Sequence, residues 1–273
     1  MYEQELEALQ RANRFRKREI FDETLIDLAS NDYLGFAEDK RLFEAAVEEV
    51  ANYRYHAPRA SQLVNGYHPL HAAFEERLCA LNGFESGIVV GSGFLANLSL
   101  IEALPRKRDL LILDEHYHAS GVLASGLVDA KVRFFRHNDP EALDAILREE
   151  RYRRAIVAVE GIYSMEGDLL HRDIFDVADR YGALLIVDEA HSSGVVGEKL
   201  LGVFEHYGIA PGPTHIKMGT LGKAMGSYGA YILATEEIIT FLQNRAKAII
   251  YATAPSLFDT ALADAALQRT QTE

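Results

Sequence analysis

The chain has 273 residues, of which 48% are hydrophobic, so it can bury the core of one large domain, or of one domain and a smaller part. Its formal net charge of −13 disfavours general binding to nucleic acid or anionic membranes, and no apolar run approaches the length of a membrane span. The single cysteine, Cys79, excludes an intramolecular disulfide and a cysteine-rich zinc site, and we expect it to be a buried small hydrophobe. With no segment typical of a signal peptide, these features predict a cytoplasmic protein.

Helical and strand patterns alternate along the chain. In chain order, the spacing of apolar residues predicts a helical stretch from about residue 4, helices over 41–53 and 70–81, a strand at 87–90, a helix over 95–104, strands at 110–113 and 132–135, a helix over 141–151, a strand at 155–159, a helix over 174–181, a strand at 184–187 and a helix beginning near Ser256. This alternation predicts an α/β fold with a mostly parallel sheet between layers of helices.

Basic residues cluster near the start of the chain, against its acidic balance. They are Arg11, Arg14, Arg16, Lys17 and Arg18, within the first predicted helical stretch. Such a cluster is typical of a solvated helix face. It is also suited to attracting an anionic substrate, such as a carboxylate or a coenzyme A phosphate. The sequence leaves both interpretations open.

Polar motifs follow successive predicted strands, where the active residues of such sheets collect. The segment 91–94 joins a strand to a helix, so its backbone amides could hold a phosphate. His118 follows the next strand and could stack on a flat ring, while Ser164 offers a hydroxyl after the strand at 155–159. Each of these residues has an ordinary alternative as a turn or cap residue. Their joint occurrence at successive strand ends favours a binding site.

Two further segments suit opposite ends of one cofactor. Lys223, in the segment 218–226, has the amine that forms a Schiff base with an aldehyde. Asp188 ends a buried strand and could hold the protonated ring nitrogen of pyridoxal 5′-phosphate (PLP), with His191 close to the ring oxygen. Together these segments predict a PLP enzyme.

The same motifs resemble those of the α-oxoamine synthase family of fold-type I PLP enzymes. The matching segments run in family order across nearly the whole chain: 30–35, 63–67 with His71, 92–94, 118–120, 163–168, 187–191 and 220–224. The resemblance implies a large domain like that of aspartate aminotransferase. It divides the chain into an N-terminal helix and substrate-lining segment (1–40), a PLP-binding domain (41–255) and the start of a connection to a further C-terminal lobe (256–273).

The resemblance also implies roles for individual residues. Catalysis would fall to Lys223, His118 and Asp188. Cofactor contacts would come from these three and from Gly93, Phe94, Ser164, His191, Thr220 and Thr253. Arg16 and Asn31 match substrate-contacting positions, and no metal is implied. The Thr253 match, to a residue that reaches the phosphate of the neighbouring subunit, implies a homodimer with shared sites.

Segments 137–139 and 226–230 favour one branch of the family. That branch condenses L-alanine with pimeloyl-CoA, or pimeloyl-carrier protein, to 8-amino-7-oxononanoate, CO2 and free thiol in biotin biosynthesis. The alternatives are glycine-using enzymes such as 2-amino-3-ketobutyrate coenzyme A ligase and 5-aminolevulinate synthase, or a truncated PLP-binding relative without catalysis. The implied partners are thus L-alanine, the acyl thioester on coenzyme A or a carrier protein, and a second subunit, with no nucleic acid or membrane partner.

Two substitutions depart from the family pattern. The segment before Leu63 is usually glycine-rich and ends in arginine, but here it contains the stiff Pro58 and the uncharged Gln62, which puts acyl-donor contacts there in doubt. Glu189 stands where aspartate is common.

A third departure concerns length, because family members continue into a second lobe whose arginine holds the amino acid carboxylate. We therefore expect a fragment that folds its cofactor domain but turns over slowly or not at all. Its last predicted helix has an apolar face with no partner evident in the sequence, formed by Leu257, Leu262, Ala265 and Leu267.

Two other readings of the motifs are disfavoured. Asp-Glu-Ala-His at 188–191 also spells the magnesium-binding motif of DEAH helicases, which requires a phosphate loop before it. Here the Gly222–Lys223 pair comes after it and lacks the following hydroxyl. A metal site at His68 and His71 lacks carboxylates at supporting spacing.

Overall fold

The structure is a computed structural model that describes residues 1–272 and divides the chain into Met1–Ser30 and a larger unit that begins at Asn31. In the first unit, α1 (Glu3–Arg11) ends where Asn13 adopts a left-handed conformation with φ 53°. The prediction of one basic helix was therefore wrong, because only Arg11 lies in the helix and the other four basic residues follow it.

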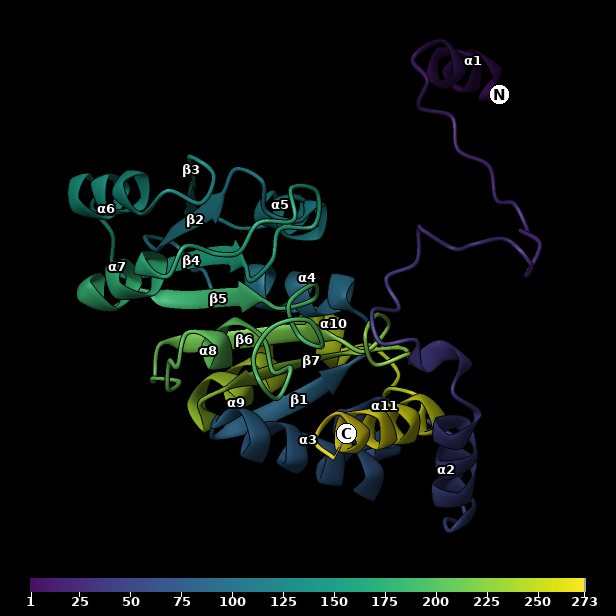
Figure 1. Ribbon diagram of the computed structural model, residues 1–273. Coiled ribbons are helices and arrows are strands. Elements are labelled where there is room, and N and C mark those ends of the chain that lie inside the picture. The colour runs from purple at the N-terminus through teal and green to yellow at the C-terminus, as the bar shows by residue number, and fades with distance from the viewer. Residues whose placement is uncertain (273) are drawn as a thin grey trace. The chain divides into compact units, whose positions relative to one another are not determined.

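The larger unit is built on a seven-stranded sheet with the order β1-β7-β6-β5-β4-β2-β3 (Figure 1). The strands are β1 (Ser86–Val90), β2 (Leu110–Asp114), β3 (Lys131–Phe135), β4 (Ala155–Glu160), β5 (Leu184–Asp188), β6 (His215–Thr220) and β7 (Ala230–Ala234). Only β7 runs against its neighbours, pairing antiparallel with β1 and β6. The predicted mostly parallel α/β sheet is confirmed, and the carboxyl ends of the other six strands meet at one edge.

Helices cover both faces of the sheet, because alternate strand residues point to opposite sides. In β2, Leu110 and Ile112 enter one core cluster, and Leu111 and Leu113 enter the other. The second cluster lies under α4 (Gly93–Ala103), α5 (Ala119–Ser125), α9 (Glu236–Arg245) and α10 (Lys247–Ile250). The opposite layer holds α2 (Lys40–Ala51), α3 (Pro69–Asn82), α6 (Pro140–Glu149), α7 (Asp173–Tyr181), α8 (Val203–His206) and α11 (Leu257–Thr270).

The five predicted strands all form, but β6 and β7 were not predicted. In β6 the charged Lys217 and the small Gly219 interrupt the apolar run, so the segment does not read as a buried strand. Its neighbours in the sheet compensate, since β5 and β7 pair with it on both sides. Tertiary pairing thus overrides the weak local signal.

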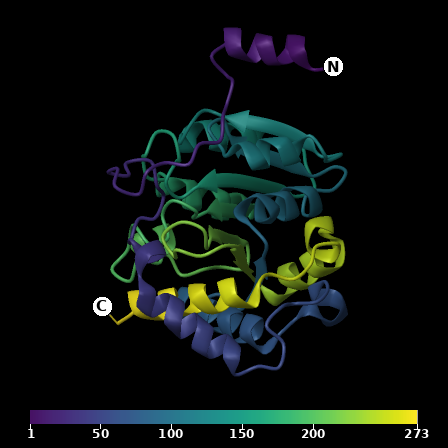
Figure 2. The same cartoon turned by 90° about the vertical axis from the view of Figure 1, so that its right-hand side faces the viewer.

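The apolar face of α11 has a partner, contrary to expectation. Leu257 and Ala261 pack with Ala46 and Val50 of α2 and with Leu70 of α3. Figure 2 shows α11 lying along α2. The partner helices precede α11 by more than a hundred residues, so the sequence pattern alone did not indicate them.

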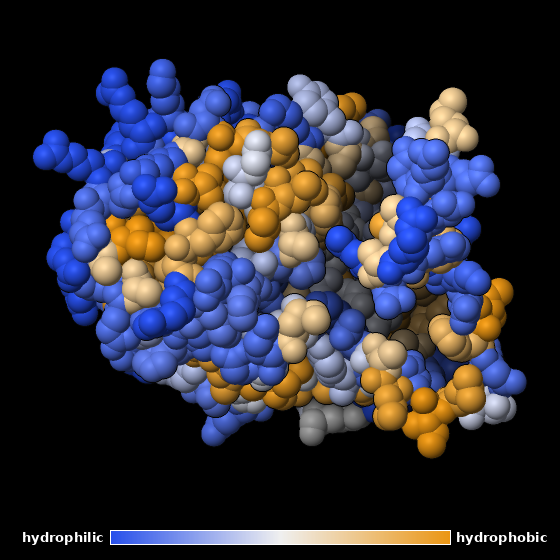
Figure 3. Space-filling view, turned by 90° about the horizontal axis from the view of Figure 1, so that it is seen from above, coloured by the Kyte–Doolittle hydropathy of each residue, from blue (hydrophilic) through white to orange (hydrophobic). Residues whose placement is uncertain are grey.

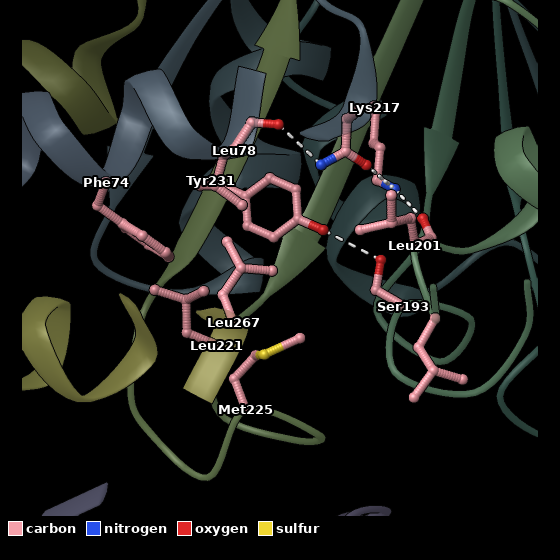
Figure 4. Close-up of a pocket in the computed structure, with 11 residues that line it drawn as sticks. Phe74, Leu78, Ser193, Leu201, Lys217, Leu221, Met225, Tyr231 and Leu267 are labelled. Carbon is pink, nitrogen blue, oxygen red and sulfur yellow. Dashed lines mark hydrogen bonds between the residues drawn. The ribbon is translucent and has the colours of Figure 1, made fainter. Parts of the chain in front are cut away.

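Lys217 is a structural lysine (Figure 4). Its Nζ donates to Asn82 Oδ1 at 2.8 Å and to the Leu201 carbonyl, and lies 3.7 Å from Glu189 Oε1, with both charged side chains fully buried. Glu189 also accepts from the Val203 amide. The cavity beside Lys217 is about 10 Å³, no more than one water requires. This lysine therefore cannot meet a cofactor.

In the part of the chain that the structure describes, no helix is long and apolar enough to cross a bilayer.

Replacing Lys217 with Ala should lower the free energy of unfolding by about 3–5 kcal/mol, because Glu189 would remain buried without its counter-charge. Urea denaturation monitored by circular dichroism measures the change. Lys199→Ala, at an exposed position, is the matched control and should change stability by less than about 0.5 kcal/mol. Equal stability of the two variants would contradict the structural role of Lys217.

Candidate active site

A cavity of about 190 Å³ opens at the carboxyl edge of the sheet. Its walls come from the start of α4, the N-cap of α5, the ends of β4 and β5, and the segment after β6. The lining residues are Gly93, Phe94, Asn97, His118, Glu160, Asp188, Ala190, His191, Met218, Thr220 and Lys223. Seven of the predicted site residues thus meet in one cavity.

Asp188 is held at the end of β5 by hydrogen bonds that the sequence did not indicate. Asn97 Nδ2 donates to Asp188 Oδ2 at 2.8 Å, and the Ala190 amide donates to Oδ1 at 3.0 Å. Tyr117 in turn donates to Asn97 Oδ1 at 2.6 Å, which fixes the orientation of that amide. Burial raises the pKa of Asp188, and the Asn97 hydrogen bond opposes the rise. A cation bound in the cavity would offset the cost of burying this charge.

Lys223 stands at one end of a hydrogen-bonded chain of side chains. Its Nζ lies 2.6 Å from His191 Nε2, and His191 Nδ1 lies 2.7 Å from the Tyr33 hydroxyl. Tyr33 donates to Asn31 Oδ1 at 3.1 Å. One ring nitrogen of neutral His191 donates and the other accepts, so its tautomer decides the direction of the bonds to Tyr33 and Lys223. The chain thus connects the predicted Asn31 to Lys223 through Tyr33, which was not predicted.

Burial shifts the pKa values of both Lys223 and His191. It lowers the pKa of Lys223, an effect that Asp188 and Glu160 partly oppose. It also lowers the pKa of His191 to about 4, helped by the positive charges of Lys223 and His118. His191 is therefore neutral near pH 7, and Lys223 gives up a proton more easily than a solvated lysine.

Gly226 fixes the turn that carries Lys223. Its φ is +57°, and a Cβ there would come within 2.7 Å of the backbone of Phe36 and Ala37. Glycine thus allows the lysine loop to pack directly on the segment that follows Asn31 and Tyr33.

Glu160, which the sequence analysis missed, ends β4 inside the cavity wall. Its side chain is 2% exposed, and its Oε2 accepts from the Ser164 amide at 3.1 Å. Burial, reinforced by the charge of Asp188, raises the pKa of Glu160 to about 8. Ser164 itself is half-buried beside the cavity and does not line it.

The start of α4 and Thr220 form the part of the cavity suited to an anion. Ser92 caps α4 by accepting from the Leu95 amide, and the first helical residues, Gly93 and Phe94, line the cavity. A Cβ on Gly93 would lie 3.7 Å from Thr220, so the two residues face each other. Free amides at a helix N-terminus attract phosphate.

His118 caps α5 and presents an exposed ring to the cavity. Its Nδ1 accepts from the Ser120 amide at 3.2 Å and lies 2.7 Å from the Ser120 hydroxyl. These contacts hold the ring at the mouth of the cavity without covering it.

Other predicted residues lie outside the cavity lining. Thr253 is exposed in the segment between α10 and α11, and Arg16 belongs to the Met1–Ser30 unit; their roles stay predictions. His68 and His71 form the capping box of α3, which accounts for their spacing without a metal. Gln62 is a structural residue, since its amide donates to the Val89 carbonyl at 2.6 Å.

The residues present fit PLP. The cavity holds a partly buried amine, a buried carboxyl with a raised pKa, an exposed flat ring and a helix N-terminus. Among residues 1–272, Glu160 Oε1 is the one buried side-chain oxygen or nitrogen without a hydrogen-bond partner, and Glu160 lines this cavity. Together with the fold, this arrangement defines a PLP-dependent enzyme of fold type I.

Comparisons with known proteins agree with that class. The sequence profile of aminotransferase class I and II matches residues 23–273. A relative from Helicobacter pylori named 8-amino-7-oxononanoate synthase is 49% identical over 270 residues, which are 98% of this chain and 72% of the relative.

Solved structures extend the comparison. Serine palmitoyltransferase from S. paucimobilis, with a bound PLP–myriocin aldimine, matches 98% of this chain and 71% of its own with a TM-score of 0.87 at 26% identity. The 8-amino-7-oxononanoate synthase from Francisella tularensis matches 92% and 70% with a TM-score of 0.75 at 27% identity. The chain belongs to the α-oxoamine synthase family, whose members are PLP-dependent acyltransferases acting on an amino acid and an acyl thioester.

Replacing Asn97 with Leu should raise the dissociation constant for PLP about 10- to 100-fold, because Asp188 loses a hydrogen bond to its charged form. Titration with PLP, followed by absorbance, measures the change. Ser99→Ala is the matched control, since Ser99 is equally buried in α4 but donates to the Leu95 carbonyl. Equal affinities for the two variants would show that Asn97 does not support Asp188.

Proposed function

We propose that this cavity catalyses the decarboxylative condensation of L-alanine with a pimeloyl thioester, carried by coenzyme A or a carrier protein, to give 8-amino-7-oxononanoate for biotin biosynthesis. The names of relatives at 49% and 27% identity support this substrate pair. The observation that carries the proposal is that Lys223, Asp188 and His118 line one cavity, whose groups suit PLP.

The reaction needs a proton to leave the alanine α-carbon, a carbon–carbon bond to form at the thioester carbonyl as the thiol departs, CO2 to leave, and a proton to return to the α-carbon in its place. When bound, PLP supplies an aldehyde for the amino group and a ring that accepts the electrons released at the α-carbon. Asp188 keeps the ring nitrogen protonated, which maintains that electron-accepting capacity.

Lys223 is the residue that holds PLP and later moves the α-proton. Its lowered pKa leaves more of the amine free to accept a proton near neutral pH. Neutral His191 lies within hydrogen-bond distance of it and is held in place by the Tyr33 hydroxyl. The chain therefore offers a proton-accepting group beside the place where the α-carbon would be held.

The remaining contacts in the proposal are to the ring face, the ring oxygen, the phosphate and the substrates. His118 stacks on the ring, and Ser164 and His191 bond on the side of the ring oxygen. The amides of Gly93 and Phe94, with the Thr220 hydroxyl, hold the phosphate. Asn31 and Arg16 contact the substrates.

We also propose a homodimer in which Thr253 reaches the phosphate held by the partner subunit. Figure 3 shows hydrophobic patches among the hydrophilic side chains of one face. Large apolar side chains are exposed on Phe94, which lines the cavity, on Val122 and Leu123 of α5, and on Leu127 just after that helix. Exposed apolar patches of this kind are typical of protein interfaces.

Replacing Lys223 with Ala should abolish the visible absorbance that PLP shows on Schiff-base formation, because no other amine lines the cavity among residues 1–272. Borohydride reduction followed by peptide mass mapping locates the modified lysine in the parent chain. Lys199→Ala, at an exposed position, should keep the absorbance. A Lys223→Ala chain that still carries the chromophore would exclude this assignment.

Adding L-alanine, glycine and L-serine separately to the PLP-loaded protein tests the amino acid. We expect L-alanine to change the cofactor spectrum at the lowest concentration, and pimeloyl-CoA or pimeloyl-carrier protein then to promote loss of the alanine α-proton, measured by deuterium exchange. A response to glycine with none to L-alanine would move the assignment to a glycine-using enzyme.

A further inference from the structure

Glu160 and Asp188 are neighbouring carboxyl groups at the floor of the cavity. They are register partners at the carboxyl ends of the parallel strands β4 and β5. Register partners on adjacent strands lie about 4.8 Å apart and point to the same face. Both side chains line the cavity and are almost completely buried, 2% and 4% exposed.

The two carboxyl groups differ in their hydrogen bonds. Each oxygen of Asp188 has a donor, Asn97 for one and the Ala190 amide for the other. Glu160 Oε2 accepts from the Ser164 amide, whereas its Oε1 is the orphaned oxygen described above. A buried polar atom without a partner is costly. The His118 amide is near enough to favour the Glu160 anion but makes no hydrogen bond to this oxygen, which is left for a bound ligand.

Electrostatics place a proton on Glu160. Two adjacent buried carboxyl groups cannot both ionise easily, and Asp188 is the better supported anion. Burial and the Asp188 charge raise the pKa of Glu160, while Lys223 and the backbone amides of Ser164 and His118 oppose the rise. Near neutral pH the orphaned oxygen is thus available as an O–H donor.

The remaining groups around Glu160 do not change this balance. The Tyr163 and Tyr117 hydroxyls lie close enough to interact with its charge, and both have pKa values raised by burial, so both stay neutral. Tyr163 donates to Asp114 Oδ2 at 2.8 Å, and Tyr117 donates to Asn97. Neither hydroxyl is free to bond Glu160 Oε1.

We propose that Glu160 is a further cofactor-binding residue, which donates a hydrogen bond from Oε1 to the ring oxygen of PLP. This rests on the placement given under the proposed function, in which Ser164 lies on the ring-oxygen side and α4 on the phosphate side. The ring oxygen is anionic when deprotonated, and hydrogen bonds to charged acceptors are the stronger kind. Asp188 and Glu160 thus act on different atoms of one ring, the first as an anion and the second as a neutral acid.

Two substitutions test whether Glu160 acts through its hydrogen-bond donor or through its negative charge. Glu160→Gln keeps an N–H donor and cannot ionise, whereas Glu160→Met keeps the size and removes the donor. We expect Glu160→Gln to bind PLP within about threefold of the parent and Glu160→Met to bind it about tenfold or more weakly. Circular dichroism and thermal unfolding in the absence of PLP establish that each variant is folded.

A pH titration of the bound cofactor's absorbance adds a readout independent of turnover. The parent should show a step near pH 8 from ionisation of Glu160, and this step should be missing in Glu160→Gln. Glu75→Gln is the matched control: burial raises the Glu75 pKa to about 7, but its carboxyl accepts from Tyr67 and the Val89 amide, outside the cavity lining. The control should keep the step.

Parent-like PLP affinity in Glu160→Met, or a step near pH 8 that persists in Glu160→Gln, would overturn the proposal. So would equal weakening by Gln and Met, because it would show that the charge and not the donor is required. None of these measurements uses an amino acid or a thioester, so a wrong substrate assignment would leave their outcome unchanged.

Discussion

The site depends on the placement of one partly buried amine beside two buried carboxyl groups. Lys223, Asp188 and Glu160 line a cavity of about 190 Å³, where each ionised group is costly unless another offsets it. Burial raises the pKa of both acids and lowers that of the amine. The neutral form of each group is therefore more favoured than it would be in water. In the proposed complex, a cofactor with a cationic ring nitrogen and an anionic oxygen would complete this balance.

The parallel sheet brings these groups together, and nearby side chains set their orientation. Asp188 ends β5, held by Asn97 and, through it, by Tyr117. On the other side, the Tyr33 hydroxyl bonds to His191, which in turn contacts Lys223. Neither supporting chain requires a charged residue of its own. The functional charges are therefore held by neutral amide, hydroxyl and imidazole groups.

Lys217 and Lys223 are close in the sequence but lie in different environments. Lys217 points into the packed core, where Asn82, the Leu201 carbonyl and Glu189 satisfy it. Lys223 follows in the loop after β6, beside open space and only one histidine. The strand lysine is enclosed by the core, whereas the loop places an amine at the carboxyl edge beside a cavity with room for a ligand.

Local patterns in the sequence were sufficient to predict the α/β class, five of the strands, and the placement of Asp188, His191 and His118 at one edge, because these residues follow predicted buried strands. Lys223 follows β6, which was not predicted, and was identified from its own segment. The tertiary structure alone decided which residues support them. Asn97 lies in the middle of α4 and Tyr33 in an irregular segment, and neither position carries a distinctive local signal. Glu160 ends an apolar strand as Asp188 does, so its position carried a signal that the sequence analysis did not use. Their importance comes from contacts across 91, 158 and 28 residues with Asp188 and His191, and contacts over such separations are set by strand register and helix packing.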